Sequence, residues 1–422
     1  MSIENIAEYM DKIGQNARNT ARQMATVPSD KKNAALRAAA QNILANKDEI
    51  ISVNKSECDA AKERGQDAAF IDRMALSKDR IAGIAQALEE IAALDDPVGK
   101  SIRKWTRPNG LEFERVRTPI GVIAIIYESR PNVTVDAAAI AVKAGNAVIL
   151  RGGSECIKTS KALFDCFQRA VIEHGLPVHA AQFVETADRA AVGEILSGLN
   201  GRIDLVIPRG GKSLVGRVQA EARAPVLSHL DGICHVYIDG EADPEKAVAL
   251  ALNAKMRRTG VCGAAETLLI DRACAQCIWP TLGKALRDEG CEIRGDSALL
   301  EIDNSVVEAT ESDWETEYLA PIISVALVDG VEGAIDHIAR YSSAHTESII
   351  TENEATAERF LSAVDSAIVM HNASTQFADG GEFGFGGEIG IATGRLHARG
   401  PAGVEELTTY KNLVRGKSHT RP

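Results

Sequence analysis

Residues 118–153 read TPIGVIAIIYESRPNVTVDAAAIAVKAGNAVILRGG, and this stretch determines the fold class of the 422-residue chain. The continuous apolar run at 119–127 predicts a buried strand, and it is far too short to span a bilayer. Residues 133–145 have the spacing of a helix that ends in a glycine. A second apolar run follows at 146–153. The stretch therefore predicts a strand, a helix and a second strand of one parallel sheet.

The same alternation of strand and helix continues as far as residue 223. The sequence predicts further helices at 156–175, 188–201 and 212–223, and further strands at 180–186 and 202–211. Because strand and helix alternate four times, we expect a doubly wound parallel sheet with helices on both faces. Ligands of such sheets bind beyond the carboxyl ends of the strands.

The regions on either side have different patterns. Residues 1–95 are Ala-rich and helical in period, and 100–119 alternate around the turn signal Pro108-Asn109-Gly110, which predicts a β-hairpin. After residue 243 a second α/β region begins, and 403–416 suit a final strand. Strand candidates of the second region lie at 267–273, 320–330, 347–353 and 367–373. We therefore expect two α/β domains and a hairpin arm.

Composition excludes several classes of function. The net charge is −12 and the sequence pI is about 5.4, so nucleic acids and anionic membrane surfaces would be repelled. The N-terminal segment MSIENIAEYMDKIG lacks the apolar run of a secretory signal, which predicts a cytoplasmic protein. The eight cysteines of the chain are then expected to be reduced. The pair CAQC (274–277) favours a helix over a metal site, because no second pair follows.

Two glycine-rich segments differ from the known nucleotide-binding fingerprints. In RGGKS (209–213), Val206 stands where a P-loop needs glycine, and in GFGGEIG (384–390), Ile389 stands where the dinucleotide fingerprint needs its third glycine. RGGKS still follows a predicted strand and opens a helix. Its main-chain N–H groups could bind a phosphate or the nicotinamide end of a cofactor, or the glycines could form a simple turn.

The segment ILRGGSE (149–155) ends another predicted strand. It offers Arg151 and Ser154 at a point where an adenosine ribose or a 2′-phosphate could lie.

Cys262, in RRTGVCGAAETLL (257–269), is the cysteine with the most reactive setting. Gly260 and Gly263 allow a ligand to approach the main chain, and Arg257 and Arg258 would favour the thiolate. The alternative is a small buried apolar residue, which is the usual fate of a free cysteine. The spacing alone favours a reactive thiol modestly.

A nucleophile that attacks a carbonyl also needs hydrogen-bond donors for the oxyanion. YESRPNVT (127–134) places Asn132 at the start of a predicted helix, where its amide could cap the helix or donate to an oxyanion. The cap is the safer interpretation from sequence. Arg130 could hold a carboxylate or phosphate, or it could be an ordinary surface arginine.

Taken together, these segments resemble the gamma-glutamyl phosphate reductases, also called glutamate-5-semialdehyde dehydrogenases, of the aldehyde dehydrogenase superfamily. The resemblance rests on residues 118–155, HLDGICHVYID, GVCGAAETLL and GEIGIATGRLHARGP, with DRMALSKDRI and DDPVG near the start. It covers nearly the whole chain.

The resemblance implies an aldehyde-dehydrogenase-like fold and its division into domains. We expect a cofactor-binding domain at 1–99 and 118–229, a catalytic domain at 230–400 and an oligomerisation arm at 100–117 and 401–422. It also implies a reaction, the NADPH-dependent reduction of L-glutamyl 5-phosphate to L-glutamate 5-semialdehyde with release of phosphate, in proline biosynthesis. A homo-oligomer is expected, and glutamate 5-kinase is a candidate donor of the labile substrate.

Site residues are carried over by motif. Cys262 matches the nucleophile, Asn132 matches the oxyanion asparagine, and Glu317 matches, more weakly, the glutamate that holds the nicotinamide ribose. Family members usually have asparagine where this chain has Gly263, and His229 stands where hydrolytic relatives have the glutamate that activates water. Candidate cofactor contacts are Arg151, Gly152, Gly153, Ser154, Gly210, Gly211, Lys212 and Glu317. Candidate substrate contacts are Arg130, Arg257 and Arg258; no metal is expected.

Two alternatives remain open. A coenzyme-A-acylating aldehyde dehydrogenase would form the same thioester and pass it to coenzyme A. A two-lobed ligand-binding protein would also have two α/β domains, although the setting of Cys262 argues against it.

Overall fold

The structure is a computed structural model that describes residues 5–421. The chain forms two compact units. Unit 1 comprises the chain up to Ser228 together with Gly384–Gly390 and the residues from Ala402 onward, and unit 2 comprises His229–Phe383 and Ile391–Pro401. Residues 384–390 thus fold with unit 1, whereas the sequence-based division placed them in 230–400.

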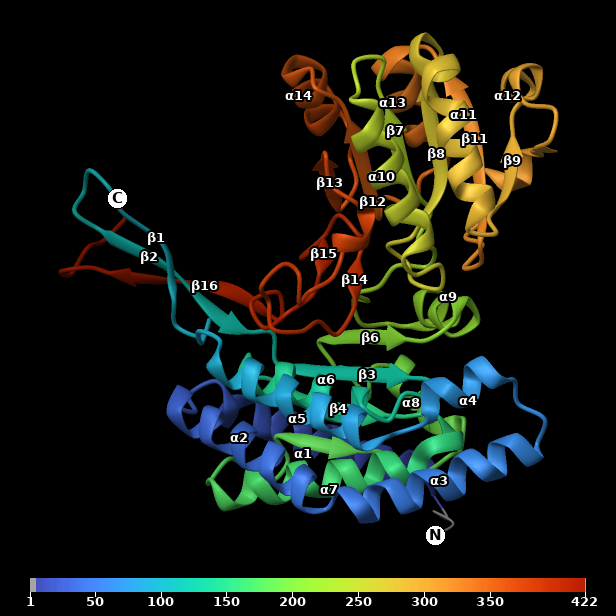
Figure 1. The fold of residues 1–422 in the computed structure, drawn as a ribbon. Coiled ribbons are helices and arrows are strands. Elements are labelled where there is room, and N and C mark those ends of the chain that lie inside the picture. The colour runs from blue at the N-terminus through green and yellow to red at the C-terminus, as the bar shows by residue number, and fades with distance from the viewer. Residues whose placement is uncertain (1–4, 422) are drawn as a thin grey trace. The chain divides into compact units, whose positions relative to one another are not determined.

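Unit 1 is built on the parallel sheet that residues 118–153 predict (Figure 1). Its strand order is β5-β4-β3-β6, and every pairing is parallel. The strands are β3 (Val122–Tyr127), β4 (Ala147–Arg151), β5 (Ala181–Phe183) and β6 (Leu205–Arg209), connected by α6 (Val133–Lys143), α7 (Ile157–Glu173) and α8 (Ala190–Leu196), with α9 (Lys212–Glu221) after β6.

Helices cover both faces of this sheet. Val122, Ala124 and Ile126 of β3 pack in one apolar cluster with residues of α1 and α8. The alternating residues of β3 are equally buried, and α6 contacts β3 and β4. The expected N-terminal helices are confirmed as α1 (Ile6–Met24), α2 (Ser29–Ala45), α3 (Lys47–Glu63), α4 (Ala68–Met74) and α5 (Lys78–Ala93).

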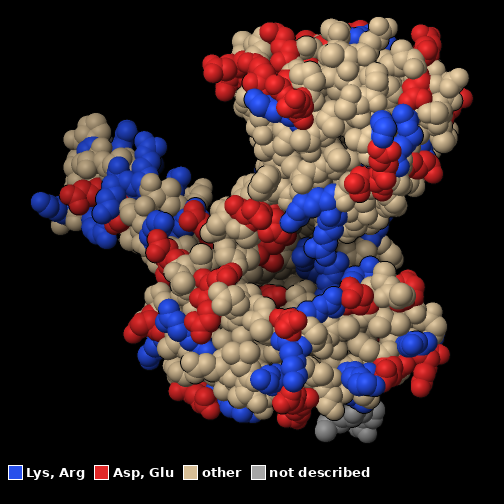
Figure 2. All heavy atoms as spheres, viewed as in Figure 1, with Lys and Arg blue, Asp and Glu red and all other residues tan. Residues whose placement is uncertain are grey.

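The hairpin and the final strand form a separate sheet of unit 1. Strands β1 (Ser101–Thr106) and β2 (Glu112–Pro119) pair antiparallel, and β16 (Thr408–Arg415) pairs with the other edge of β2. Lysines and arginines gather over these strands (Figure 2). The hairpin and the final strand are thus confirmed, and the role of this sheet in oligomerisation stays a prediction.

Unit 2 is built on a seven-stranded sheet with order β10-β9-β11-β8-β7-β12-β13, all of it parallel (Figure 1). The strands are β7 (Cys234–Ile238), β8 (Ala265–Asp271), β9 (Glu292–Gly295), β10 (Val307–Glu308), β11 (Ile322–Val328), β12 (Thr346–Ile350) and β13 (Ile368–His371). Strands β9 and β10 were not predicted, because both are short and partly exposed and lack a long apolar run.

Helices lie on both faces of this sheet as well. Helices α10 (Pro244–Met256) and α11 (Arg272–Asp288) pack on one face, and α13 (Gly330–Tyr341) and α14 (Glu354–Ala363) pack on the other. The short helix α12 (Ser297–Ile302) follows β9, and β14 (Ile391–Ala392) pairs with β15 (Gly400–Pro401).

CAQC lies inside α11 with Cys274 buried and Cys277 exposed, so the helical interpretation is confirmed. Among the described residues, no helix is both long and apolar enough to span a bilayer.

Candidate active site

Asn132 lies where β3 turns into α6 in unit 1, and its side chain does not cap the helix. The residue already has helical backbone angles, and its Nδ2 donates to Oδ2 of Asp136 at 2.9 Å. The predicted cap is therefore wrong, because the Asn132 amide bonds to the Asp136 carboxylate, one turn along α6, and not to the main chain. One N–H of the amide is held by Asp136, which fixes the direction of the other.

Asp136 is a buried carboxylate with an unusual balance of interactions. Burial raises its pKa to about 6, against the hydrogen bond from Asn132 and the positive charge of Arg209, which lower it. Its Oδ1 has no hydrogen-bond partner in the structure. Asp136 belongs to no motif, and its spacing of four residues from Asn132 on the predicted helix is the signal by which the sequence could indicate it.

The glycine pair after β6 forms the start of α9, as the sequence predicted. Gly211 is the N-cap residue of α9, and its main-chain N–H donates to the Glu128 carboxylate at 2.7 Å. A Cβ on Gly210 would lie 2.6 Å from the same carboxylate, so a side chain there would displace Glu128 from the start of α9. The N-terminus of α9 therefore binds an anionic group in this structure, as a helix N-terminus favours. Lys212 follows on the exposed first turn.

The residues at the end of β4 have a different environment from the one predicted. Arg151 is buried and donates to the carbonyl oxygens of Gly152 and Ala187, at 2.8 and 3.1 Å. Its guanidinium thus holds the main chain of the loop, while Ser154 is exposed and donates to Glu155. The contact of Arg151 with a cofactor stays a prediction. Gly152 and Gly153 follow Arg151 and are buried, and Arg130 is exposed in the β3–α6 loop. The expected contacts of these three residues with cofactor and substrate stay predictions.

Cys262 lies in unit 2, in the turn between α10 and β8, and its side chain is half-buried. The main chain of Cys262 is closely held: a Cβ on Gly232 would lie 2.4 Å from the Cys262 carbonyl oxygen. The Cys234 thiol donates to that same oxygen at 3.1 Å. The glycine of the segment HLDGI is thus required by the approach of the cysteine turn.

Gly263 has a packing explanation. A Cβ at this position would lie 3.0 Å from the Thr375 carbonyl oxygen and 3.4 Å from the Ala378 Cβ. The turn at Thr375–Phe377 therefore leaves little room for a side chain after Cys262.

Two imidazoles lie beside Cys262. Ring nitrogens of His229 and His345 and the Cys262 Sγ all lie within 4.8 Å of one another, and the two rings meet edge to face with centroids 4.9 Å apart. Burial lowers the pKa of His345 to about 3, with a smaller effect from His229. The sequence singled out His229 but missed His345, which belongs to no motif.

Arg257 and Arg258 follow α10 directly, and both side chains are exposed. The Arg258 carbonyl accepts a hydrogen bond from Gln376 at 3.2 Å, which ties this turn to the segment that packs against Gly263. The expected effect of the two arginines on the Cys262 thiolate stays a prediction.

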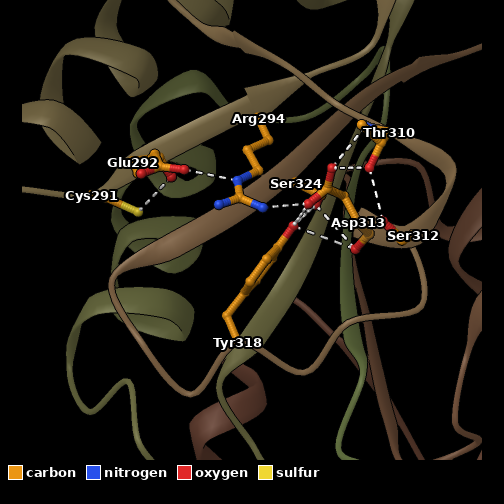
Figure 3. Close-up of polar contacts among 8 residues, drawn as sticks. All are labelled: Cys291, Glu292, Arg294, Thr310, Ser312, Asp313, Tyr318 and Ser324. Atoms are coloured by element: carbon orange, nitrogen blue, oxygen red, sulfur yellow. Dashed lines mark hydrogen bonds and ion pairs between the residues drawn. The ribbon is translucent and has the colours of Figure 1, made fainter.

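Glu317 lies in the loop before β11, next to an anchored tyrosine. The Tyr318 hydroxyl bonds with Ser324 at 2.7 Å and with Asp313 at 2.9 Å, and Arg294 pairs with the same aspartate (Figure 3). Although burial raises the pKa of Asp313, hydrogen bonds from Thr310, Arg294 and Tyr318 hold it well below its usual range. The network fixes the main chain that carries Glu317.

A buried ion pair, also missed by sequence, lies beside this loop. Lys255 and Glu266 are fully buried and paired, and the Leu319 N–H donates to Glu266 at 3.2 Å. Burial, with a smaller contribution from the charge of Glu317, raises the pKa of Glu266 to about 7 against the attraction of Lys255.

Comparisons with known proteins agree with this architecture. The model of the aldehyde dehydrogenase family matches residues 4–289 and 305–413. The chain is 58% identical over 419 residues to a gamma-glutamyl phosphate reductase of Parvibaculum lavamentivorans, covering 99% of both chains. The crystal structure of a gamma-glutamyl phosphate reductase from Thermotoga maritima is similar with a TM-score of 0.95 at 44% identity, covering 98% of this chain and 100% of that chain. An acetylating aldehyde dehydrogenase from Geobacillus thermoglucosidasius shares the fold, with a TM-score of 0.70 at 17% identity and full coverage of both chains.

Proposed function

Because the chain belongs to the aldehyde dehydrogenase family and, within it, to the gamma-glutamyl phosphate reductases, we propose that it reduces L-glutamyl 5-phosphate to L-glutamate 5-semialdehyde with NADPH. The reaction releases phosphate and serves proline biosynthesis. The observation that carries this proposal is the setting of Cys262, a half-buried thiol on a tightly held turn.

The other cysteines lack this setting. Burial raises the pKa of the thiols of Cys156 and Cys274, to about 12 and about 11, and it also raises the pKa of Cys58, Cys166, Cys234 and Cys291. Cys277 lies on the exposed face of α11. Buried thiols of raised pKa carry little thiolate and react slowly. Cys262 is therefore the best candidate for the nucleophile.

In the proposed reaction the Cys262 thiolate attacks the acyl phosphate, and the carbonyl oxygen becomes an oxyanion. The main-chain N–H of Cys262 and the amide of Asn132 donate to this oxyanion, and the position of Asn132 is set by Asp136. Phosphate leaves and a thioester remains. We assign the binding of the anionic substrate to Arg130, Arg257 and Arg258.

The N-terminus of α9 fits the phosphates of a dinucleotide. Its Gly211 N–H already holds a carboxylate, and Gly210 leaves the main chain open. We propose that Gly210, Gly211 and Lys212 bind the cofactor together with Gly152, Gly153 and Ser154, and that Glu317 holds its nicotinamide ribose. When bound, NADPH supplies the hydride that reduces the acyl group.

Protection of the thioester from water follows from His229. Its Nδ1 lies 2.7 Å from the Ile391 carbonyl oxygen, so that nitrogen carries the proton and is committed to the main chain. Hydrolytic relatives have at this position the glutamate that activates water, whereas this chain has a histidine. The absence of that carboxylate keeps the acyl group available to hydride.

A phosphate-dependence assay tests the proposal. Purified protein should oxidise glutamate semialdehyde with NADP+ only when inorganic phosphate is present, and NAD+ should support a lower rate. Dependence on coenzyme A in place of phosphate would identify an acylating dehydrogenase. Turnover without either acceptor would mean that water resolves the thioester and would contradict the role given to His229.

A further inference from the structure

His229, Cys262 and His345 have the composition and spacing of a metal site. Their ligand atoms lie within 4.8 Å of one another, and all three residues belong to unit 2. Tetrahedral zinc holds neighbouring ligand atoms about 3.3 to 3.8 Å apart, given bond lengths of about 2.0 Å to nitrogen and about 2.3 Å to sulfur. A movement of about 1 Å would bring the three ligand atoms to these distances, and the half-buried Cys262 side chain has room for it.

His345 carries the second observation. Its Nδ1 lies 2.9 Å from Thr346 Oγ1 and 3.5 Å from Cys234 Sγ. Its Nε2 is buried and has no hydrogen-bond partner among residues 5–421, while the whole side chain is 0% exposed. A buried polar atom without a partner needs an explanation. Since Nδ1 is engaged, Nε2 is the nitrogen that a ligand would use.

His229 is oriented in the way that metal-binding histidines usually are. Its Nδ1 lies 2.7 Å from the Ile391 carbonyl oxygen. An N–H bound to a carbonyl fixes the ring and places the lone pair on the other nitrogen, which is the arrangement found behind most histidine ligands.

The donor set selects the ion. Two imidazoles and one thiolate suit a borderline-soft divalent cation such as Zn²⁺ and suit Mg²⁺ or Ca²⁺ poorly, because those ions prefer oxygen. Three protein ligands leave the fourth position to solvent.

We propose that His229, Cys262 and His345 bind one Zn²⁺ ion. Binding forms a Zn–S bond and releases the thiol proton to solvent, with no change of oxidation state. While the ion is bound, the Cys262 sulfur is not available for covalent reaction, and a chelator restores it. The binding goes beyond the proposed function and does not depend on it.

The test uses the full-length protein, freed of metal with a chelator and titrated with Co²⁺ as a spectroscopic probe. A sulfur-to-cobalt charge-transfer band should reach its maximum at one equivalent and should disappear when Zn²⁺ is added. Competition with a chromophoric chelator then gives the Zn²⁺ affinity. His229→Asn and His345→Asn should each lower this affinity by more than about 100-fold, because even outer partners of metal ligands change affinity by 10- to 100-fold.

Cys277→Ser is the matched control, because it removes an exposed cysteine of the same unit. The control should keep both the band and the affinity. Thermal unfolding of each variant shows whether it is folded, and the half-buried His229 provides a ligand variant that disturbs the core less than His345 does.

Alkylation gives a readout that needs no activity. Zn²⁺ at one equivalent should slow the reaction of Cys262 with iodoacetamide, read by mass spectrometry, and leave Cys277 unchanged. Absence of a charge-transfer band in folded protein, or equal affinity in the folded histidine variants and the wild type, would overturn the metal site. Neither result would bear on phosphate-dependent turnover, so the two proposals fail separately.

Discussion

The functional residues of unit 1 and those of unit 2 lie in opposite electrostatic environments. In unit 1 the loops after β3 and β6 present exposed charged side chains, Glu128, Arg130 and Lys212, next to a helix N-terminus. In unit 2 the Cys262 thiol lies beside the buried, neutral His345 and the closely packed Gly232. Charged groups and main-chain dipoles suit reversible binding of anions, whereas a half-buried thiol on a tightly held turn suits covalent chemistry.

The difference predicts how the two regions respond to substitution. Changes in unit 2 should affect the chemical step, and changes among the exposed groups of unit 1 should affect affinity and salt dependence. Asn132 is an exception in unit 1, because it is proposed to act on the reacting carbonyl. Arg257, Arg258 and Glu317 are exceptions in unit 2, because they are proposed to bind ligands.

Replacing Cys262 with alanine should have the largest effect, a loss of turnover on the order of 10⁴-fold or more, because the covalent step disappears. Binding of NADPH, followed by fluorescence titration, should stay within about twofold of wild type, since the proposed phosphate contacts lie in unit 1. Cys277→Ala is the control. Reduction that continues near the wild-type rate in Cys262→Ala would exclude the thioester scheme.

Asn132→Ala should lower kcat by about 100- to 1000-fold, the usual effect of losing one oxyanion donor. Stability should fall by about 1 to 3 kcal/mol, because the buried Asp136 carboxylate loses the hydrogen bond from Asn132. Urea unfolding and steady-state kinetics on the same preparation separate the effect on stability from the effect on kcat. A large loss of stability with a small loss of kcat would return Asn132 to a structural role.

The contrast between Asn132 and Cys262 also shows what the sequence can predict. The strands and helices of both units followed from period and length, because buried parallel strands have continuous apolar runs. For Asn132 the sequence favours a helix cap over an oxyanion donor, because a cap needs only the local main chain. The hydrogen bond to Asp136, one turn further along α6, overrides this preference.

Around Cys262 the missing information is long-range. Gly232 could be seen as a glycine but not as the contact surface of the cysteine turn, and the place of Gly263 depends on Thr375. His345 comes just before β12 and Cys262 just before β8, and the two meet because β7 pairs with both of these strands. No local pattern encodes such a contact.

Asp136→Asn should change the pH dependence of stability. The folded pKa of Asp136 is about 6 and the unfolded value is about 3.9, so the folded state binds the proton more tightly. This contribution to stability is fully present below about pH 4, is lost as the pH rises to about 6, and stays lost above it. Wild type and variant should therefore be similar at pH 4, and the variant should gain up to about 3 kcal/mol at pH 7.5.

Urea unfolding of both proteins at pH 4, 5 and 7.5 measures this difference. The asparagine side chain can still accept from Asn132, so kcat at neutral pH should remain within about tenfold of wild type. A constant difference in unfolding free energy across this pH range would show that Asp136 does not titrate as its burial implies.

Gly232→Ala should destabilise unit 2 by about 1 to 3 kcal/mol and displace Cys262, since the new Cβ meets main-chain atoms that cannot rotate away. Gly260→Ala is the control, because nothing lies within 4 Å of a Cβ there. Thermal unfolding and the rate of Cys262 alkylation should both change in the first variant only. Equal behaviour of the two variants would mean that the turn is less constrained than these distances indicate.

The smallest expected effect concerns Glu128, whose carboxylate binds the Gly211 N–H that we assign to the cofactor phosphates. Because carboxylate and phosphate compete for the same donor, Glu128→Gln should lower the Kd of NADPH by about two- to fivefold and weaken its salt dependence little. Glu221→Gln, at the other end of α9 and paired with Arg217, is the charge-matched control. If Glu128→Gln instead weakens NADPH binding, the carboxylate supports the bound cofactor, and the anion site of unit 1 would lie elsewhere than at the start of α9.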